Sequence, residues 1–200
     1  MMHATKTAAA LIDEALACMG LFAPPDRAFF CEVMNECLSR LYTDILRECA
    51  SVTLPIVGGA LALDAIPSPT EEGVREEDVF ALALDGRDAR YLPPDLAAAA
   101  SGASAPFYTV TDGKIIPLCE ASEARISFVL RPPLCREGEE ESYEIPLAPE
   151  FLPLLSARLC GEGFRRAGED ALAASWLADY NHRLSDFAVY VETAKGKRGN

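Results

Sequence analysis

The stretch PFYTVTDGKIIPL, residues 106–118, places two short β-like runs on either side of Asp112–Gly113. A two-residue hairpin turn of type I′ needs a positive φ at both of its central residues, and Asp-Gly is favoured there because both residues tolerate that conformation. The stretch therefore predicts a β-hairpin. Two further β-like runs flank it, VFALALDG at 79–86 and EARISFVLRPPL at 123–134. The middle of the chain is thus expected to be rich in strands.

Other parts of this middle region carry weaker signals. SVTLPIV, at 51–57, is interrupted by proline and predicts an edge strand or an extended connection. The proline pair in YLPPDLAAAASG, at 91–102, predicts a short helical turn. CREGEEESYEIPL, at 135–147, predicts an acidic loop that joins two more short strands.

Helical spacing flanks the β-rich region on both sides. Apolar residues recur every three or four positions in four segments, which is the pattern of amphipathic helices. The expected helices cover residues 7–19, 26–50, 149–167 and 169–191.

The order of these segments predicts the fold class. We expect an α+β, mainly α fold, in which a bundle of about four helices, two N-terminal and two C-terminal, is interrupted by a β-rich insertion at about 51–147. Residues 1–200 form a single domain in this prediction, and about 193–200 form a flexible tail.

Composition limits the class of partner. The 200 residues carry a formal net charge of −13, which argues against nucleic acid as the main partner, because phosphate backbones bind basic surfaces. No apolar run is long enough to cross a bilayer, so we expect a soluble intracellular protein without a membrane partner. The seven cysteines include no C-x-x-C pair, which predicts buried free thiols in a reducing compartment.

The sequence lacks the patterns of an enzyme. Gly58–Gly59 has no Lys-Ser/Thr after it, so no phosphate loop is expected. The acidic pairs lie in polar loops and are expected to be solvated. His182 is expected to face solvent with Asp179 and Asp186. We therefore predict no catalytic, metal-binding or cofactor-binding residues, no cofactor and no enzymatic activity.

The last helix and the tail contain two groups of residues for which the sequence predicts a role, one in packing and one at the surface. A core seam of the last helix is predicted from residues spaced three to four positions apart, namely Trp176, Tyr180, Leu184 and Phe187. The chain ends in a basic segment with Lys195, Lys197 and Arg198. This segment either docks on an acidic protein surface or is a disordered solubilising tail.

Residues 125–187 resemble the C-terminal half of phage head–tail connector (adaptor) proteins. In that family a strand ends in an Arg-Pro turn, an acidic loop and an Ile-Pro-x-Glu-like entry lead to a helix, and a final helix carries aromatic residues at fixed spacing. The matching positions are Arg131–Pro132, Ile145, Pro146, Glu150, Asp170, Ala174, Trp176, Tyr180 and Leu184. The two N-terminal helices are also similar to that family, whereas the Pro- and Glu-rich segment 64–78 departs from it.

The resemblance implies a structural virion protein. Family members assemble as a ring, usually twelvefold, beneath the capsid portal, where they extend the DNA channel and join the capsid to the neck or tail. The implied partners are other copies of the chain, the portal protein and a stopper or tail-completion protein, with DNA only as passing cargo. The implied location is the virion neck, assembled in the host cytoplasm. It also implies that Lys195, Lys197 and Arg198 dock on the portal.

Two alternatives stay open. One is a non-enzymatic cytosolic interaction module that binds a partner helix or peptide in the bundle groove. The other is an enzyme that uses His182 with its neighbouring aspartates.

Overall fold

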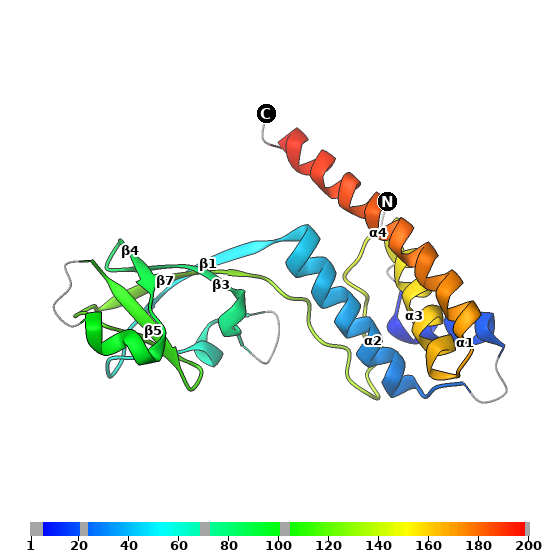
Figure 1. Cartoon of the computed structure of the whole chain (residues 1–200), viewed down its shortest axis with the longest axis horizontal. Helices are drawn as coiled ribbons and strands as arrows, with labels where there is room; N and C mark the ends of the chain where they lie inside the picture. The colour runs from blue at the N-terminus through cyan, green and yellow to red at the C-terminus, as the bar shows by residue number, and fades with distance from the viewer. Residues whose placement is uncertain (1–5, 21–23, 69–72, 101–104, 199–200) are drawn as a thin grey trace. The chain divides into compact units, whose positions relative to one another are not determined.

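The chain divides into two compact units. The computed structural model describes residues 6–20, 24–68, 73–100 and 105–198. Residues Met1–Leu41 and Leu134–Asn200 form the first unit, here called the helical unit, and residues Tyr42–Pro133 form the second, here called the β unit (Figure 1). The sequence predicts one domain over the residues that the structure groups in two.

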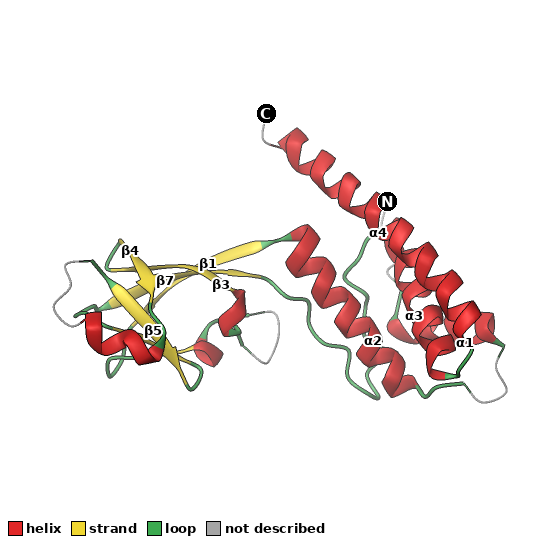
Figure 2. Cartoon of the chain, viewed as in Figure 1, coloured by secondary structure: helices red, strands yellow, loops and turns green. Residues whose placement is uncertain are grey.

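Four α-helices form the helical unit (Figure 2). They are α1 (Ala8–Met19), α2 (Arg27–Arg40), α3 (Leu152–Arg166) and α4 (Asp170–Arg198). Asp26 begins α2 by accepting a hydrogen bond from the Phe29 amide at 2.8 Å, and Gly20 ends α1 in the left-handed region at φ 56°. Helix α3 contacts each of the other three helices. No helix in the described ranges is both long and apolar enough to cross a membrane.

The helix expected at 26–50 ends earlier than its apolar pattern suggests. Helix α2 ends at Arg40, a π-helical turn, η1 (Leu41–Leu46), follows, and Arg47 adopts a positive φ of 47°. A β-strand then begins at Cys49. Residues 49 and 50 are strand because they pair with a distant segment of the chain, and such pairing overrides local helix propensity.

The helix near the C-terminus is longer than expected. A 3-10 turn, η5 (Pro149–Phe151), precedes α3, close to the predicted start. Helix α4 continues to Arg198, so residues 193–198 are helical where a flexible tail is predicted. Residues 199–200 lie outside the described ranges.

A seven-stranded mixed sheet forms the β unit. Its strands are β1 (Cys49–Pro55), β2 (Leu61–Ala62), β3 (Val79–Leu84), β4 (Arg87–Tyr91), β5 (Phe107–Thr111), β6 (Lys114–Pro117) and β7 (Glu123–Val129). They lie side by side in the order β1-β7-β3-β4-β5-β6-β2. Strands β4 and β5 are parallel, and the other pairs are antiparallel.

Two Asp-Gly turns shape this sheet. Asp112 and Gly113, at φ 51° and 67°, join β5 to β6 as the sequence predicts. Asp85 and Gly86, at φ 46° and 78°, join β3 to β4 in the same way. Strand β4, with the sequence RDARY, is largely exposed, so it lacks the apolar alternation by which sequence analysis finds strands.

The prediction of a helical bundle with a β-rich insertion is wrong. The seven strands are a central part of the fold and enclose a hydrophobic core of their own. This core includes Leu61, Leu63, Ile66, Val74, Leu82, Leu84, Tyr108, Val110, Ile115, Ala124, Ile126 and Phe128. The physical reason for the error is that β2 and β4 are too short or too polar to be recognised, and without them the remaining strands do not predict a closed core.

The predicted insertion also ends too late. Residues 134–147 belong to the helical unit, where Asn35 of α2 makes two hydrogen bonds of 2.9 Å with the backbone of Cys135. Ile145 is buried, and its amide donates to the Lys6 carbonyl. In place of the two short strands expected there, this segment contains turns and an isolated β-bridge between Thr7 and Glu144.

Candidate functional site

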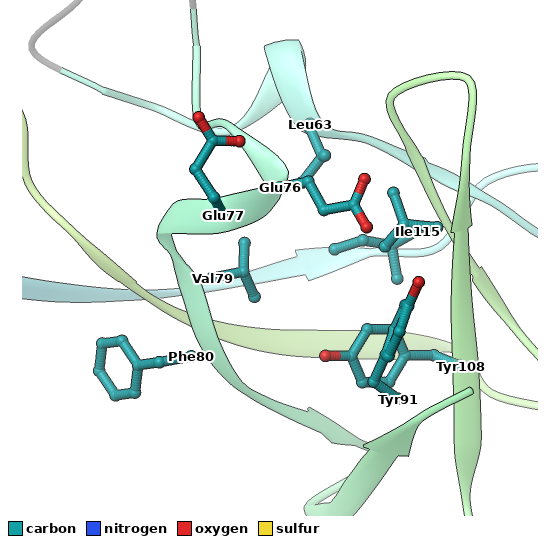
Figure 3. Close-up of a pocket in the computed structure, with 9 residues that line it drawn as sticks. Leu63, Glu76, Glu77, Val79, Phe80, Tyr91, Tyr108 and Ile115 are labelled. Carbon is teal, nitrogen blue, oxygen red and sulfur yellow. The ribbon is translucent and has the colours of Figure 1, made fainter. Parts of the chain in front are cut away.

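A pocket in the β unit offers a candidate site (Figure 3). Its volume is about 530 Å³, within the range of about 300–1,000 Å³ that is typical of ligand pockets. Apolar and aromatic side chains form most of its wall, and two carboxylates lie at its edge. The lining residues are Leu63, Glu76, Glu77, Val79, Phe80, Tyr91, Tyr108, Val110 and Ile115.

Strand pairing places the aromatic wall of the pocket. Tyr91 ends β4 and Tyr108 lies in β5, and the parallel pairing of these strands sets the two residues opposite each other. Their rings meet edge to face, with centroids 5.7 Å apart, a geometry that aromatic quadrupoles favour. Phe80 of β3 is 59% exposed although it lines the pocket. The wall is thus built from segments that are distant in sequence.

A buried ion pair holds the acidic edge in place. Glu76 and Glu77 lie in a short 3-10 turn, η3 (Glu76–Asp78), directly before β3. Asp78, at the end of this turn, is only 4% exposed. Arg131, just beyond β7, donates from Nε to both Asp78 oxygens at 2.8 Å, and its Nη2 lies 2.7 Å from Oδ1. This bidentate pairing fixes the turn that carries the two glutamates.

The two glutamates have different surroundings. In Figure 3 the Glu76 carboxylate points toward Ile115 and the two tyrosines, whereas Glu77 points away from them. Glu77 lies 3.5 Å from Arg131 and 4.0 Å from Arg75. Burial raises the pKa of Tyr108, and the neighbouring charges of Tyr91 and Glu76 raise it further. Glu76 is exposed and places a negative charge at the edge of the pocket, facing the tyrosines.

The described lining residues indicate what the pocket can bind. They include two carboxylates and two phenols, and among them there is no histidine, cysteine or lysine. No group of three or more possible metal ligands occurs among the described residues. The arrangement can hold an apolar group that carries a positive charge.

His182 lies on an exposed side of α4. Its side chain is 77% exposed, and its Nε2 lies 3.8 Å from Asp186. Asp179 accepts a hydrogen bond of 2.8 Å from Arg183 instead. The structure thus places His182 on the solvent side of α4, with one of its two expected partners.

The four residues of the predicted seam lie on one side of α4, to different depths. Tyr180 and Phe187 are buried, and Trp176 and Leu184 are half-buried. Tyr180 accepts from the Cys37 thiol at 3.7 Å. Arg158 of α3 lies over its ring, 5.3 Å from the centroid. These contacts give the seam a packing role.

The three basic residues near the C-terminus belong to the helical unit, whereas the pocket belongs to the β unit. Lys195, Lys197 and Arg198 lie in the last turns of α4. Val191 is the last buried residue of this helix up to residue 194, where the described side chains end.

Sequence analysis missed the pocket and part of the acidic chemistry. It assigned the acidic pairs to solvated loops; Glu76 and Glu77 are exposed as predicted, whereas Glu140 is buried. Asp78, which directly follows one of these pairs, is buried as well. Glu140 accepts hydrogen bonds from the Gly138 amide at 3.1 Å and from the Cys31 thiol at 3.5 Å. The one available signal is that Asp78 directly precedes a β-like run, where a turn is anchored to the sheet.

Neither the protein-family models nor the curated proteins compared with this chain match its sequence.

Proposed function

We propose that this chain is a structural virion protein, a head–tail adaptor that assembles as a ring under the portal of a tailed phage. The ring, twelvefold in this proposal, extends the DNA channel and joins the capsid to the neck or tail. Its partners are other copies of the chain, the portal protein and a stopper or tail-completion protein.

The main observation behind the proposal is that the residues shared with the adaptor family make structural contacts in this fold. Arg131 holds the buried Asp78, Ile145 is buried beside the N-terminal helices, and Tyr180 packs against α2 and α3. All three stabilise the fold and none lies in a catalytic arrangement. A motif made of packing residues is expected of a structural family.

The charge of the β unit supports the same proposal. Residues 42–133 carry fourteen acidic and seven basic side chains, a net charge of −7. An acidic wall lets DNA pass without binding, because it offers few cations to the phosphate backbone.

The proposal predicts that a portal protein is encoded near this chain, and it is tested with the full chain and that portal protein. Mass photometry and negative-stain electron microscopy of the mixture are expected to show rings bound to the portal. The chain alone and the portal alone are the controls. Absence of binding at micromolar concentration and low salt would overturn the proposal.

A further inference from the structure

The pocket of the β unit contains a carboxylate without a cation. Among the residues that the structure describes, Glu76 makes no ion pair, although it points toward the tyrosines and Ile115. Glu77, in contrast, is shared between two arginines. A negative charge beside an apolar wall favours a ligand that brings its own positive charge.

The side chains of the pocket wall indicate which class of ligand it can bind. Leu63, Val79 and Ile115 provide an aliphatic surface, and Tyr91 and Tyr108 provide aromatic rings. A lysine or arginine side chain fits both, because its methylene stem packs on apolar atoms while its charged end reaches a carboxylate or a ring face. The ligand is therefore a peptide segment rich in lysine and arginine.

The chain itself carries such a segment. The C-terminal arm, residues 193–198, has three basic residues and no acidic one. Helix α4 has 29 residues and its partner α3 has 15, so about 20 Å of α4 has no counterpart in α3 at the usual rise of 1.5 Å per residue. The far end of α4 lies beyond α3 in Figure 1. The arm follows Val191, the last buried residue of α4 among those whose side chains are described.

We infer that the pocket of the β unit binds the C-terminal arm of a second copy of this chain. The contact is heterologous, with a basic arm on one subunit and an acidic pocket on the next, and contacts of this kind generate rings when the rotation closes. The inference rests on the proposed function and specifies how neighbouring subunits hold each other.

Charge reversal of the full chain tests the contact. The pocket variant is Glu76→Lys, and the arm variant combines Lys195→Glu, Lys197→Glu and Arg198→Glu. Sedimentation velocity over a dilution series at low salt is expected to show self-association weakened about tenfold or more in each variant alone. Glu120→Lys makes the same charge change at an exposed site of the β unit outside the pocket, and is expected to associate like the wild type.

Mixing the two variants makes the test specific. The pocket variant has a basic arm, and the arm variant has an acidic pocket, so each variant offers the other a complementary partner. Association in the mixture is expected to recover to within about threefold of the wild type. Recovery in the mixture also excludes binding of the arm to the pocket of its own chain, because binding within one chain would not be restored by adding the other variant.

Each outcome has a defined meaning. A wild-type chain that stays monomeric throughout the series, variants that associate normally, or a mixture that does not recover would overturn the inference. An arm variant that loses only portal binding would assign the arm to the portal and would also overturn it. Rings on the portal that tolerate both variants would leave the proposed function standing without this contact. Rescue in the mixture without any ring on the portal would support the contact and overturn the proposed function.

Discussion

The two units of this chain are stabilised by contacts of different range. In the helical unit, amphipathic segments pack on each other, and their boundaries follow local signals such as Asp26 and Gly20. In the β unit, residues far apart in sequence form the ladder, as when β1 pairs with β7. Local contacts produce a recognisable pattern in the sequence, whereas long-range contacts produce almost none. The function proposed for the pocket depends on long-range contacts.

Removal of one core phenylalanine from each unit has the largest expected effect and tests whether the units are independent. Phe30 of α2 and Phe128 of β7 are both almost fully buried. Each change to alanine is expected to lower the free energy of unfolding of its own unit by about 3 to 5 kcal/mol. Fluorescence of Trp176, the single tryptophan, reports the helical unit during urea unfolding, and amide hydrogen exchange of β5 and β6 reports the β unit. Equal shifts of both probes in both variants would show that the two units unfold as one.

The buried ion pair gives the next largest effect, confined to the β unit. Asp78→Ala removes the buried carboxylate that binds the guanidinium of Arg131, which keeps Glu77 at 3.5 Å, and is expected to cost about 3 kcal/mol. Amide hydrogen exchange of β3 and β7 measures this loss in the free energy of unfolding of the β unit. The double variant Asp78→Ala with Arg131→Met removes both charges and is expected to recover part of the loss. A cost below about 1 kcal/mol for Asp78→Ala would show that the acidic turn is held by other contacts.

Low pH is expected to lower the free energy of unfolding of both units, because each unit contains a carboxylate with a lowered pKa. Hydrogen bonds from its own amide and from Gly138 lower the pKa of Glu140 in the helical unit. Hydrogen bonds from Ser122 and from the Glu123 amide lower the pKa of Asp85 in the β unit. A carboxyl with a lowered folded pKa binds its proton more readily in the unfolded state, so its stabilisation is complete above the unfolded pKa of about 4 and is lost as the pH falls below it.

Neutral variants test this pH dependence unit by unit. Glu140→Gln is expected to reduce the acid sensitivity of the Trp176 unfolding transition, and Asp85→Asn that of hydrogen exchange in β3. An unchanged pH profile in either variant would show that other carboxyls control acid unfolding of that unit.

Loss of His182 is expected to have the smallest effect. The side chain is exposed and its contact with Asp186 is 3.8 Å long, so His182→Ala is expected to change the free energy of unfolding by about 0.5 kcal/mol or less. Urea unfolding followed by Trp176 measures it, and ring formation on the portal is expected to be unchanged. A large loss of assembly would point to a role for His182 that its exposure does not explain.

The sequence by itself determined the local features of this protein. The Asp112–Gly113 turn, the edge position of β1 and the starts of α2 and α4 follow from residues within a few positions of each other, because turns, caps and helical contacts are short-range. The seam of Tyr180 and Phe187 follows from helical spacing in the same way.

Only the tertiary structure decided the rest. It ended the helical segment before Cys49, because residues from Cys49 onward pair with β7. It placed the polar strand β4 beside β5, which brings Tyr91 to Tyr108, and it paired Asp78 with an arginine 53 positions away. The pocket is made of these long-range pairs. Their energies depend on the whole sheet being formed, so no local pattern in the sequence could have indicated them.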